Sequence, residues 1–252
     1  MYDFQKANMW KRISAAICDL ILLCIAVVGV ALLLSTALGY DGYTTRLEEI
    51  SNSYAEEYNV DLDISQSEYD ALSEDDRARY EAADKAFAAD SEANYVYQMI
   101  VNLTLIIVTF SILVAYLLLE FLVPLLFGNG QTLGKKVFGV AVMREDGVKI
   151  SPVILFARAI LGKYTLETMI PVFIFLMILL GLMGVLGTVF IFALLIIQIV
   201  LVAITKARTP LHDKLAHTVC VDLASQMIFD TPDDLLEYKK RIHAEKVEEE
   251  KN

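Results

Sequence analysis

The sequence contains little of what disulfide-linked or nucleic-acid-binding proteins need. It has three cysteines, Cys18, Cys24 and Cys220, and the first two lie in one apolar run, so no disulfide framework is expected. Lysine and arginine (21 residues) are outnumbered by aspartate and glutamate (32 residues), which gives a net charge of -11. Without a concentrated basic face, the chain is not expected to bind nucleic acid.

Motifs of the common enzyme classes are also lacking. Residues 130–136 (GQTLGKK) resemble a phosphate-binding loop, but Asn129 occupies its first glycine position and Lys136 replaces its serine or threonine. There is no Gly-x-Ser-x-Gly or His-Glu-x-x-His motif. His212 and His217 are five residues apart, a spacing that does not place two metal ligands on one helical face. We therefore expect no enzyme, no metal site and no cofactor.

The acidity is confined to one segment, and the rest of the chain is apolar. Asp41 to Glu92 contains sixteen acidic and four basic residues, a balance of -12, so the remainder carries about +1. This segment could bind cations or a partner, or its charge could simply keep an external domain soluble. Hydrophobic residues make up 56% of the chain and its mean hydropathy is +0.53, which predicts a membrane protein.

Three long apolar runs predict four membrane-spanning helices. Ile13–Leu38 and Ile100–Phe127 each exceed the ~20 helical residues that cross a bilayer. Met169–Ile204 would be ~54 Å long as one helix, and its central glycines favour a hairpin of two spans that turns around Leu182–Gly187. A cleaved signal peptide is the alternative for the first run, but a signal core is only ~7–15 residues long and would not carry Asp19.

Basic residues near the span ends predict the orientation. They precede the first span, lie between residues 128 and 163, and follow the last span at Lys206, Arg208 and Lys214. Both termini are therefore expected in the cytoplasm and the acidic segment outside, as in a multi-pass protein of a bacterial inner membrane.

The segments between the spans show local patterns of their own. Tyr43, Leu47 and Ile50 recur at helical spacing in the acidic segment. Ser73 with Asp76 resembles a capping box, which predicts a second helix there. This segment is therefore expected to be a helical extracytoplasmic insertion.

The cytoplasmic segments are expected to form a small sheet and a short helix. Val137–Met143 and Val148–Ile150 predict a β-hairpin that turns at residues 144–147, and Thr218–Asp222 predicts a strand that joins it. Ser151-Pro152 predicts the start of a short helix, Val153–Leu161, that lies at the membrane face.

The expected fold is thus an all-α membrane protein: a four-helix transmembrane bundle with a small cytoplasmic β-sheet and a helical insertion. Its divisions are 1–38 (N-terminus and first span), 39–98 (insertion), 99–127 (second span), 128–167 (β-hairpin and interfacial helix), 168–205 (third and fourth spans) and 206–252 (closing segment and charged tail).

Polar residues within the spans mark candidate functional positions. Arg12 and Asp19 are seven residues apart and share a helical face. Asn102, Thr109 and Glu120 are expected on one face of the second span, and Gln198 lies in the fourth. We expect these faces to turn toward one another.

A carboxylate at membrane depth is costly, by at least ~2.5 kcal/mol, and usually has a partner. The candidate partners of Asp19 are Arg12, Arg158 and His212. Asp19 and Glu120 could form a cation or proton site. Alternatively, the charges could be a buried ion pair that fixes the register of the helices.

Three sequence blocks together resemble the RDD family of bacterial membrane proteins, which is named for one arginine and two aspartates. Residues 11–19 (KRISAAICD) resemble its opening block and contain Arg12 and Asp19. Glu120, residues 130–140 (GQTLGKKVFGV) and residues 146–147 (DG) resemble its central block, with Arg158 as a later arginine. Residues 211–219 (LHDKLAHTV) resemble its closing block, with Asp213 as the second aspartate and His217 where a glycine is expected.

The resemblance implies a helical membrane domain and leaves two functions open. Some family members are described as sodium/proton antiporters and others as partners or regulators of membrane enzymes. The first function would exchange Na+ or K+ for H+ in a homo-oligomer, with Asp19 and Glu120 titrating, Arg12 and Arg158 tuning their charge, and Asp213 holding a cytoplasmic gate. The second would be an adaptor that binds a partner membrane protein and whose charges, including His212, are structural.

Overall fold

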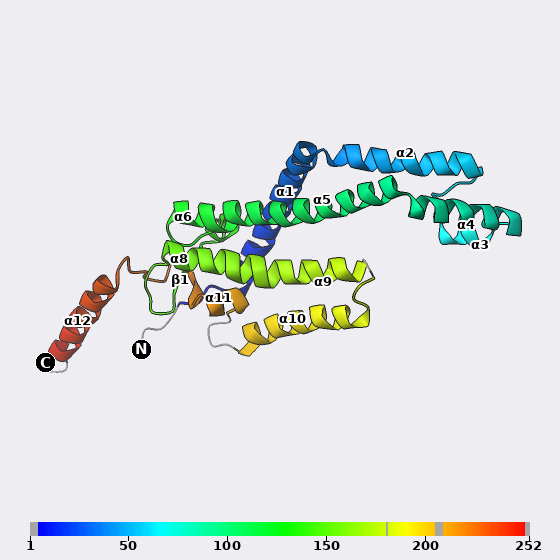
Figure 1. Cartoon of the computed structure of the whole chain (residues 1–252). Coiled ribbons are helices and arrows are strands. Elements are labelled where there is room, and N and C mark those ends of the chain that lie inside the picture. Colours follow the sequence, from blue (N-terminus) through cyan, green and yellow to red (C-terminus); the bar gives the residue numbers. More distant parts are fainter. Residues whose placement is uncertain (1–4, 180, 205–208, 250–252) are drawn as a thin grey trace. The chain divides into compact units, whose positions relative to one another are not determined.

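The computed structural model describes residues 5–179, 181–204 and 209–249, and is mainly helical (Figure 1). Four helical segments are long and apolar enough to cross a membrane: Met9–Leu38, Ser91–Phe127, Pro152–Leu179 and Val185–Ile204. The protein is therefore an integral membrane protein, and the expected number of spans is confirmed. Lys206 and Arg208, which entered the orientation argument, lie outside the described residues.

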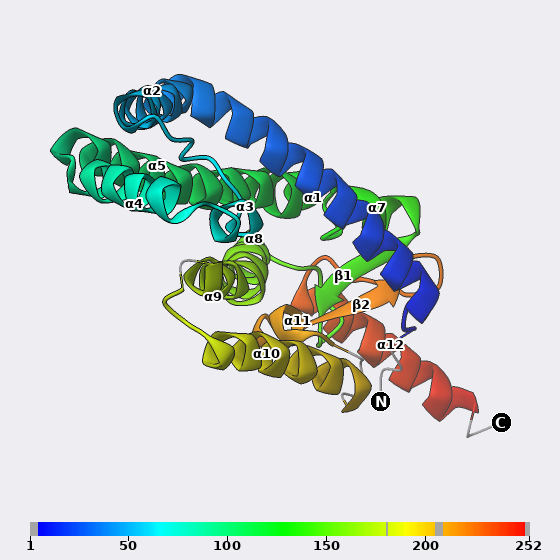
Figure 2. The same cartoon turned by 90° about the vertical axis from the view of Figure 1, so that its right-hand side faces the viewer.

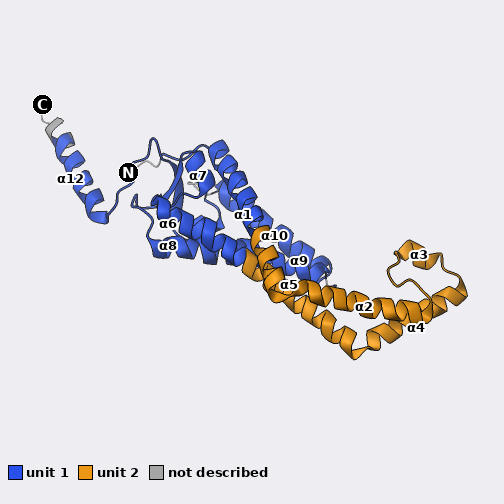
Figure 3. Cartoon of the chain, turned by 90° about the horizontal axis from the view of Figure 1, so that it is seen from above, with its two compact units in different colours: residues 1–27, 112–252 blue, residues 28–111 orange. Residues whose placement is uncertain are grey.

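The chain divides into two compact units (Figure 3). One comprises residues 28–111 and the other comprises residues 1–27 with 112–252. Two spanning helices, α1 (Met9–Leu38) and α5 (Ser91–Tyr116), have residues in both units. The charged groups discussed below all belong to the unit formed by residues 1–27 and 112–252.

The acidic segment folds into helices α2 (Tyr40–Tyr58), α3 (Gln66–Asp70) and α4 (Glu74–Ala89). The predicted periodicity is confirmed, because Ile50 is buried with Ala93 and Val96 of α5, and Tyr43, Leu47 and Tyr54 pack against them. The predicted start of α4 is also confirmed: the Ser73 hydroxyl accepts a hydrogen bond from the Asp76 backbone N–H at 3.2 Å and satisfies a helix-terminal donor.

The second span changes helix type partway along. After α5 it continues as a π-helix, η1 (Leu117–Leu122), and then as α6 (Val123–Phe127). A π-helix is hydrogen-bonded from residue i to residue i+5 and winds more loosely than an α-helix. Side-chain directions projected along an α-helix therefore do not carry through η1.

The third span begins earlier than the sequence suggested. Helix α8 (Pro152–Phe156) continues without a break through a second π-helix, η2 (Ala157–Met169), into α9 (Ile170–Leu179). This corrects the expectation of a separate interfacial helix at Val153–Leu161. The predicted span started at Met169 because charged residues precede it. In the fold these charged residues are paired with others, as described below.

The third and fourth spans form the predicted hairpin. Helix α9 ends at Leu179 and α10 (Val185–Ile204) begins six residues later. Gly181 has a φ of +70°, a backbone conformation that glycine adopts without steric cost. The turn therefore lies a few residues before the expected Leu182–Gly187.

A two-stranded antiparallel sheet pairs β1 (Val140–Arg144) with β2 (Thr218–Asp222) (Figure 2). In its register, Val142 lies opposite Cys220. The predicted strand at Thr218–Asp222 is confirmed. The second arm of the predicted hairpin is corrected, because residues 148–150 form only isolated bridges, Met143 with Lys149 and Val148 with Phe229. β1 pairs with β2 instead because β2 has five residues to pair with it, whereas the predicted arm at residues 148–150 has three.

Both faces of the sheet are buried, which holds it against the rest of its unit. Val140, Val142 and Cys220 pack on one side with Leu155 of α8. Ala141, Met143, Val219 and Val221 pack on the other. Three further helices complete the described fold: α7 (Leu133–Val137), α11 (Leu211–Leu215) and α12 (Pro232–Glu249). The predicted tail helix, residues 237–252, thus begins earlier, and its last three residues lie outside the described chain.

His217 occupies a turn that favours glycine. It lies between α11 and β2 with a φ of +49°, in the left-handed region where a side chain is strained. We expect His217→Gly to raise the free energy of unfolding by about 1 kcal/mol. Thermal unfolding in detergent measures this change. The control is His243→Gly, in exposed helix α12, which should lower the stability of the protein or leave it unchanged. An unchanged or lower stability of His217→Gly would show that the strain is offset by contacts of the imidazole.

Candidate ion-paired cavity

Asp19 binds the start of α7. Its Oδ1 accepts the Gly134 backbone N–H at 2.7 Å, and its Oδ2 accepts the Thr132 hydroxyl. The Lys135 ammonium lies 3.8 Å from Oδ2. A carboxylate at this position satisfies helix-terminal N–H groups. The contacts of Asp19 are thus with Thr132, Gly134 and Lys135, whereas two of its expected partners, Arg158 and His212, bond to Asp213 and Glu167 instead.

Gly134 is required for this contact. A Cβ at residue 134 would lie 2.8 Å from Asp19 Oδ1 and would also collide with the backbone carbonyl of Ala15. Ala15 is itself almost fully buried. The glycine in α7 and the alanine in α1 therefore allow the two helices to approach until the aspartate reaches the α7 backbone.

Glu120 lies in η1 and is buried against the third span. Its Oε1 is 2.6 Å from the Lys163 ammonium of η2. Its Oε2 has no hydrogen-bond partner among the described residues. A buried carboxylate with one unsatisfied oxygen is unusual in a folded protein. Glu120 therefore has binding capacity that its ion pair with Lys163 does not use.

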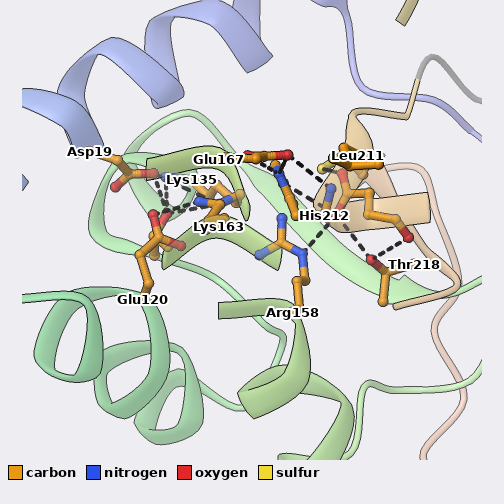
Figure 4. A network of polar contacts seen from close by, with 12 residues as sticks. Asp19, Glu120, Lys135, Arg158, Lys163, Glu167, Leu211, His212 and Thr218 are labelled. Carbon is orange, nitrogen blue, oxygen red and sulfur yellow. Dashed lines mark hydrogen bonds and ion pairs between the residues drawn. The ribbon is translucent and has the colours of Figure 1, made fainter. Parts of the chain in front are cut away.

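The π-helix η2 places three charged residues on one face. Arg158, Lys163 and Glu167 are separated by five and then four residues. In an α-helix, at ~100° per residue, Lys163 and Glu167 would point ~140° and ~180° away from Arg158. The looser π-helical winding repeats every four to five residues instead. All three side chains therefore turn toward the same space (Figure 4).

Arg158 and Asp213 form a fully buried ion pair. The Arg158 Nε donates to Asp213 Oδ1 at 2.7 Å, and both side chains are 1% exposed. The Thr218 hydroxyl donates to the same oxygen at 2.9 Å. Burial favours a raised pKa for Asp213, but the Arg158 guanidinium outweighs it and holds the pKa below its usual range. This pair joins the third span to α11 and β2.

His212 forms the next link. Its Nδ1 lies 2.8 Å from Glu167 Oε2, and its backbone N–H donates to Glu167 Oε1 at 2.9 Å. Burial lowers the pKa of His212, although the adjacent Asp213 opposes this shift. Gly162 makes the contact between η2 and α11 possible, since a Cβ there would lie 2.7 Å from the Cβ of His212.

These groups surround a cavity of about 420 Å³, a volume typical of small-ligand sites. Charges of both signs line it in equal number: four carboxylates face four cationic side chains, in addition to His212. The carboxylates are Asp19, Glu120, Glu167 and Asp213; the cations are Arg12, Lys135, Arg158 and Lys163. Burial and the nearby Lys163 ammonium lower the pKa of Lys135.

Six of the residues predicted from the sequence are brought together at this cavity: Arg12, Asp19, Glu120, Arg158, His212 and Asp213. Gln198 lies beside it, where its Oε1 accepts the Leu211 backbone N–H at 3.3 Å. Asn102 and Thr109 belong to the other unit and are not among the described residues that line the cavity. Their alignment with Glu120 on one face stays a prediction.

The sequence argument missed Lys135, Lys163 and Glu167. The signal for Lys163 and Glu167 is the pair of gaps from Arg158, five residues and then four, which is invisible when α-helical periodicity is assumed. Lys135 lies in α7 and is outside this pattern. In the described part of the chain, no three His, Cys, Asp or Glu side chains are grouped closely enough to hold a metal ion.

The fold and the cavity define a class: an integral membrane protein in which an internal cluster of ion pairs joins the spans to a small sheet. Comparison with known protein families matches the RDD family over residues 6–217. The chain belongs to the RDD family. Comparisons with curated proteins and with solved structures gave no match.

Proposed function

We propose that the protein exchanges a monovalent cation for protons at the pair formed by Glu120 and Lys163. The observation that carries this proposal is the composition of the cavity, in which four carboxylates are balanced by two ammonium and two guanidinium groups. A buried site tolerates little net charge. A cation can therefore enter only if a positive charge leaves, and the Lys163 proton is the charge most directly opposite a carboxylate.

The proposed step is balanced. A cation binds to the Glu120 carboxylate, the Lys163 ammonium becomes a neutral amine, and one proton is released. Glu120 Oε2, which has no partner among the described residues, supplies an additional oxygen ligand. Lys135 and Asp19 form a second pair of the same type at 3.8 Å, and the lowered pKa of Lys135 favours proton release there as well. No catalytic role is proposed for these groups.

The proposal places the cavity near the cytoplasmic side of an inner membrane, with both termini in the cytoplasm, because basic residues flank the spans at that side. Residues 20–38, 170–179 and 185–204 carry no charged side chain. A single chain of four spans therefore offers no charged route across the remaining membrane thickness. We propose that a homo-oligomer completes the pathway.

Transport is tested by measuring collapse of a pH gradient in proteoliposomes after addition of Na+ or K+. The variant Glu120→Gln/Lys163→Gln removes both charges and keeps the cavity neutral, so its folding should be preserved. We expect wild-type flux to fall to the level of empty liposomes in this variant. The control Lys149→Gln/Asp230→Asn removes an exposed ion pair and should leave flux unchanged. Full flux in the cavity variant would contradict exchange at this pair.

A second candidate function is an adaptor that binds a partner membrane protein. The favouring observation is that charged residues join spans to segments outside them. Asp19 of the first span contacts α7, and Glu167 of the third span contacts α11. Asp213 of α11 in turn contacts Arg158 of the third span. In this function the charges attach these segments to the spans and nothing moves through the cavity. Absence of flux for all ions in folded wild-type protein would favour the adaptor.

A further inference from the structure

An apolar groove adjoins the charged cavity. It has a volume of about 530 Å³ and is lined by Met9, Gln198, Ile199, Val202 and Ala203. Met9 and Val202 also line the cavity, so the two spaces meet at these residues. Gln198, whose side chain is bonded to the α11 backbone, lies at the polar end of the groove. The charged cavity thus lies beside an apolar groove on the surface of a membrane span.

The position of Trp10 indicates the membrane depth at which the groove begins. Trp10, the only tryptophan of the chain, directly follows Met9 and is 75% exposed. Tryptophans are enriched at the boundary between headgroups and hydrocarbon. Along α10, Ile199 and Ala203 are exposed on a helix whose side chains are apolar except for Thr188 and Gln198. The groove therefore extends from the headgroup region into the hydrocarbon.

The cavity has unused capacity for both a donor and an acceptor. Among the described residues, Glu120 Oε2 lacks a hydrogen-bond donor and Arg158 Nη1 lacks an acceptor. Both residues line the cavity, and both are more than nine-tenths buried. Lys163 adds an ammonium with three donor hydrogens, of which its bond to Glu120 uses one. Equal numbers of carboxylates and cations line the space, which matches a ligand that carries one charge of each sign.

We propose that this cavity and groove bind one zwitterionic phospholipid of the phosphatidylethanolamine type. The phosphate accepts hydrogen bonds from Lys163 and Arg158, the ammonium donates to Glu120, and an acyl chain lies against Ile199, Val202 and Ala203. Because Glu120 Oε2 and Arg158 Nη1 are shielded from solvent, binding turns both side chains toward the cavity. The lipid uses Glu120 and Lys163, so it competes with a cation for the same groups, and its binding is measured without any flux.

The headgroup requirement distinguishes this site from ordinary lipid contact. Phosphatidylcholine has the same charges, but its trimethylated nitrogen has no hydrogen to donate to Glu120. Phosphatidylglycerol has the phosphate and no ammonium. Loss of one charge-assisted hydrogen bond weakens binding by about tenfold or more. We therefore expect phosphatidylethanolamine to bind at least about tenfold more tightly than either of the others.

The experiment is lipid titration of the delipidated full-length protein in detergent, followed by native mass spectrometry. One phosphatidylethanolamine per chain should bind with the stated preference, and Glu120→Gln should abolish the preference over phosphatidylcholine. Glu120→Gln/Lys163→Gln keeps the cavity neutral in case the single variant does not fold, and should likewise lose the preference. Equal binding of the three lipids by wild type, or a preference that survives in the double variant, would overturn the proposal.

A matched pair of variants tests the groove. Ile199→Trp fills the groove, whereas Ile197→Trp places the same residue on another face of α10, where the side chain is also exposed. We expect Ile199→Trp alone to weaken lipid binding by about tenfold, the scale of a lost apolar contact of this size. Equal losses in both variants would overturn the acyl-chain site. Free phosphoethanolamine that binds as tightly as the lipid would show that the ligand is a soluble phosphate compound instead.

Discussion

Replacing Arg158 with methionine is expected to lower the free energy of unfolding by about 3–5 kcal/mol, the typical effect of removing one partner of a buried ion pair. The guanidinium is 1% exposed and bonds to an equally buried Asp213. Without it, Asp213 would keep the Thr218 hydroxyl, the Cys220 thiol and His212 as neighbours but would lose the cation bonded directly to its carboxylate. Thermal unfolding in detergent, followed by circular dichroism, measures the loss.

The control is the double variant Arg158→Met/Asp213→Leu. Replacing both members of a buried pair with apolar residues of similar volume is often neutral or stabilising, so most of the lost stability should return. Lys149→Met, which removes an exposed ion pair with Asp230, should change stability by less than about 1 kcal/mol. If Arg158→Met behaves like Lys149→Met, the pair does not hold the third span to α11.

Gly162→Ala is expected to separate η2 from α11. The added Cβ would lie 2.7 Å from the Cβ and 2.9 Å from the Cα of His212. A flexible side-chain end cannot relieve this collision, because the atoms belong to or adjoin the α11 backbone. Overpacking of this type typically costs about 1–3 kcal/mol, and the bond between His212 and Glu167 should be lost with it.

Two measurements follow Gly162→Ala. The free energy of unfolding should fall. Cys220, a buried thiol beside Asp213, should also react faster with an alkylating reagent. Peptide mass spectrometry distinguishes its modification from that of Cys18 and Cys24. Gly29→Ala is the matched control, because Gly29 lies in helix α1 with open space where a Cβ would be, and alanine is the better helix former there. Unchanged Cys220 reactivity in Gly162→Ala would show that α11 tolerates the methyl group without moving.

The number of spans and the local structure of the insertion follow from the sequence because their physics is local. A run of apolar residues longer than the bilayer, such as Ile13–Leu38, has few alternatives to a spanning helix. The periodicity from Tyr43 to Tyr54 and the Ser73 cap are likewise readable within one helix. The strand Thr218–Asp222 was predicted for the same reason, since its residues favour β-structure and are flanked by a turn.

The start of the third span and the partners of Asp19 depend on tertiary contacts. Hydropathy read along the chain excludes Arg158 and Lys163 from a membrane span, whereas in the fold Asp213 and Glu120 neutralise them. The π-helices are equally hidden, because α-helical projection is the only register that a single sequence suggests. Six cavity residues were nevertheless identified, since charged groups at membrane depth must find one another.

The most direct test of the proposed exchange is the number of protons released when Na+ or K+ is added to the detergent-solubilised protein in weakly buffered solution. The measurement needs no transport pathway and no oligomer. If a cation replaces the Lys163 proton at Glu120, wild type should release about one proton for each cation bound, because the buried cavity must stay neutral, and Glu120→Gln/Lys163→Gln should release none. Cation binding without proton release, or the same release from the variant, would contradict exchange at this pair.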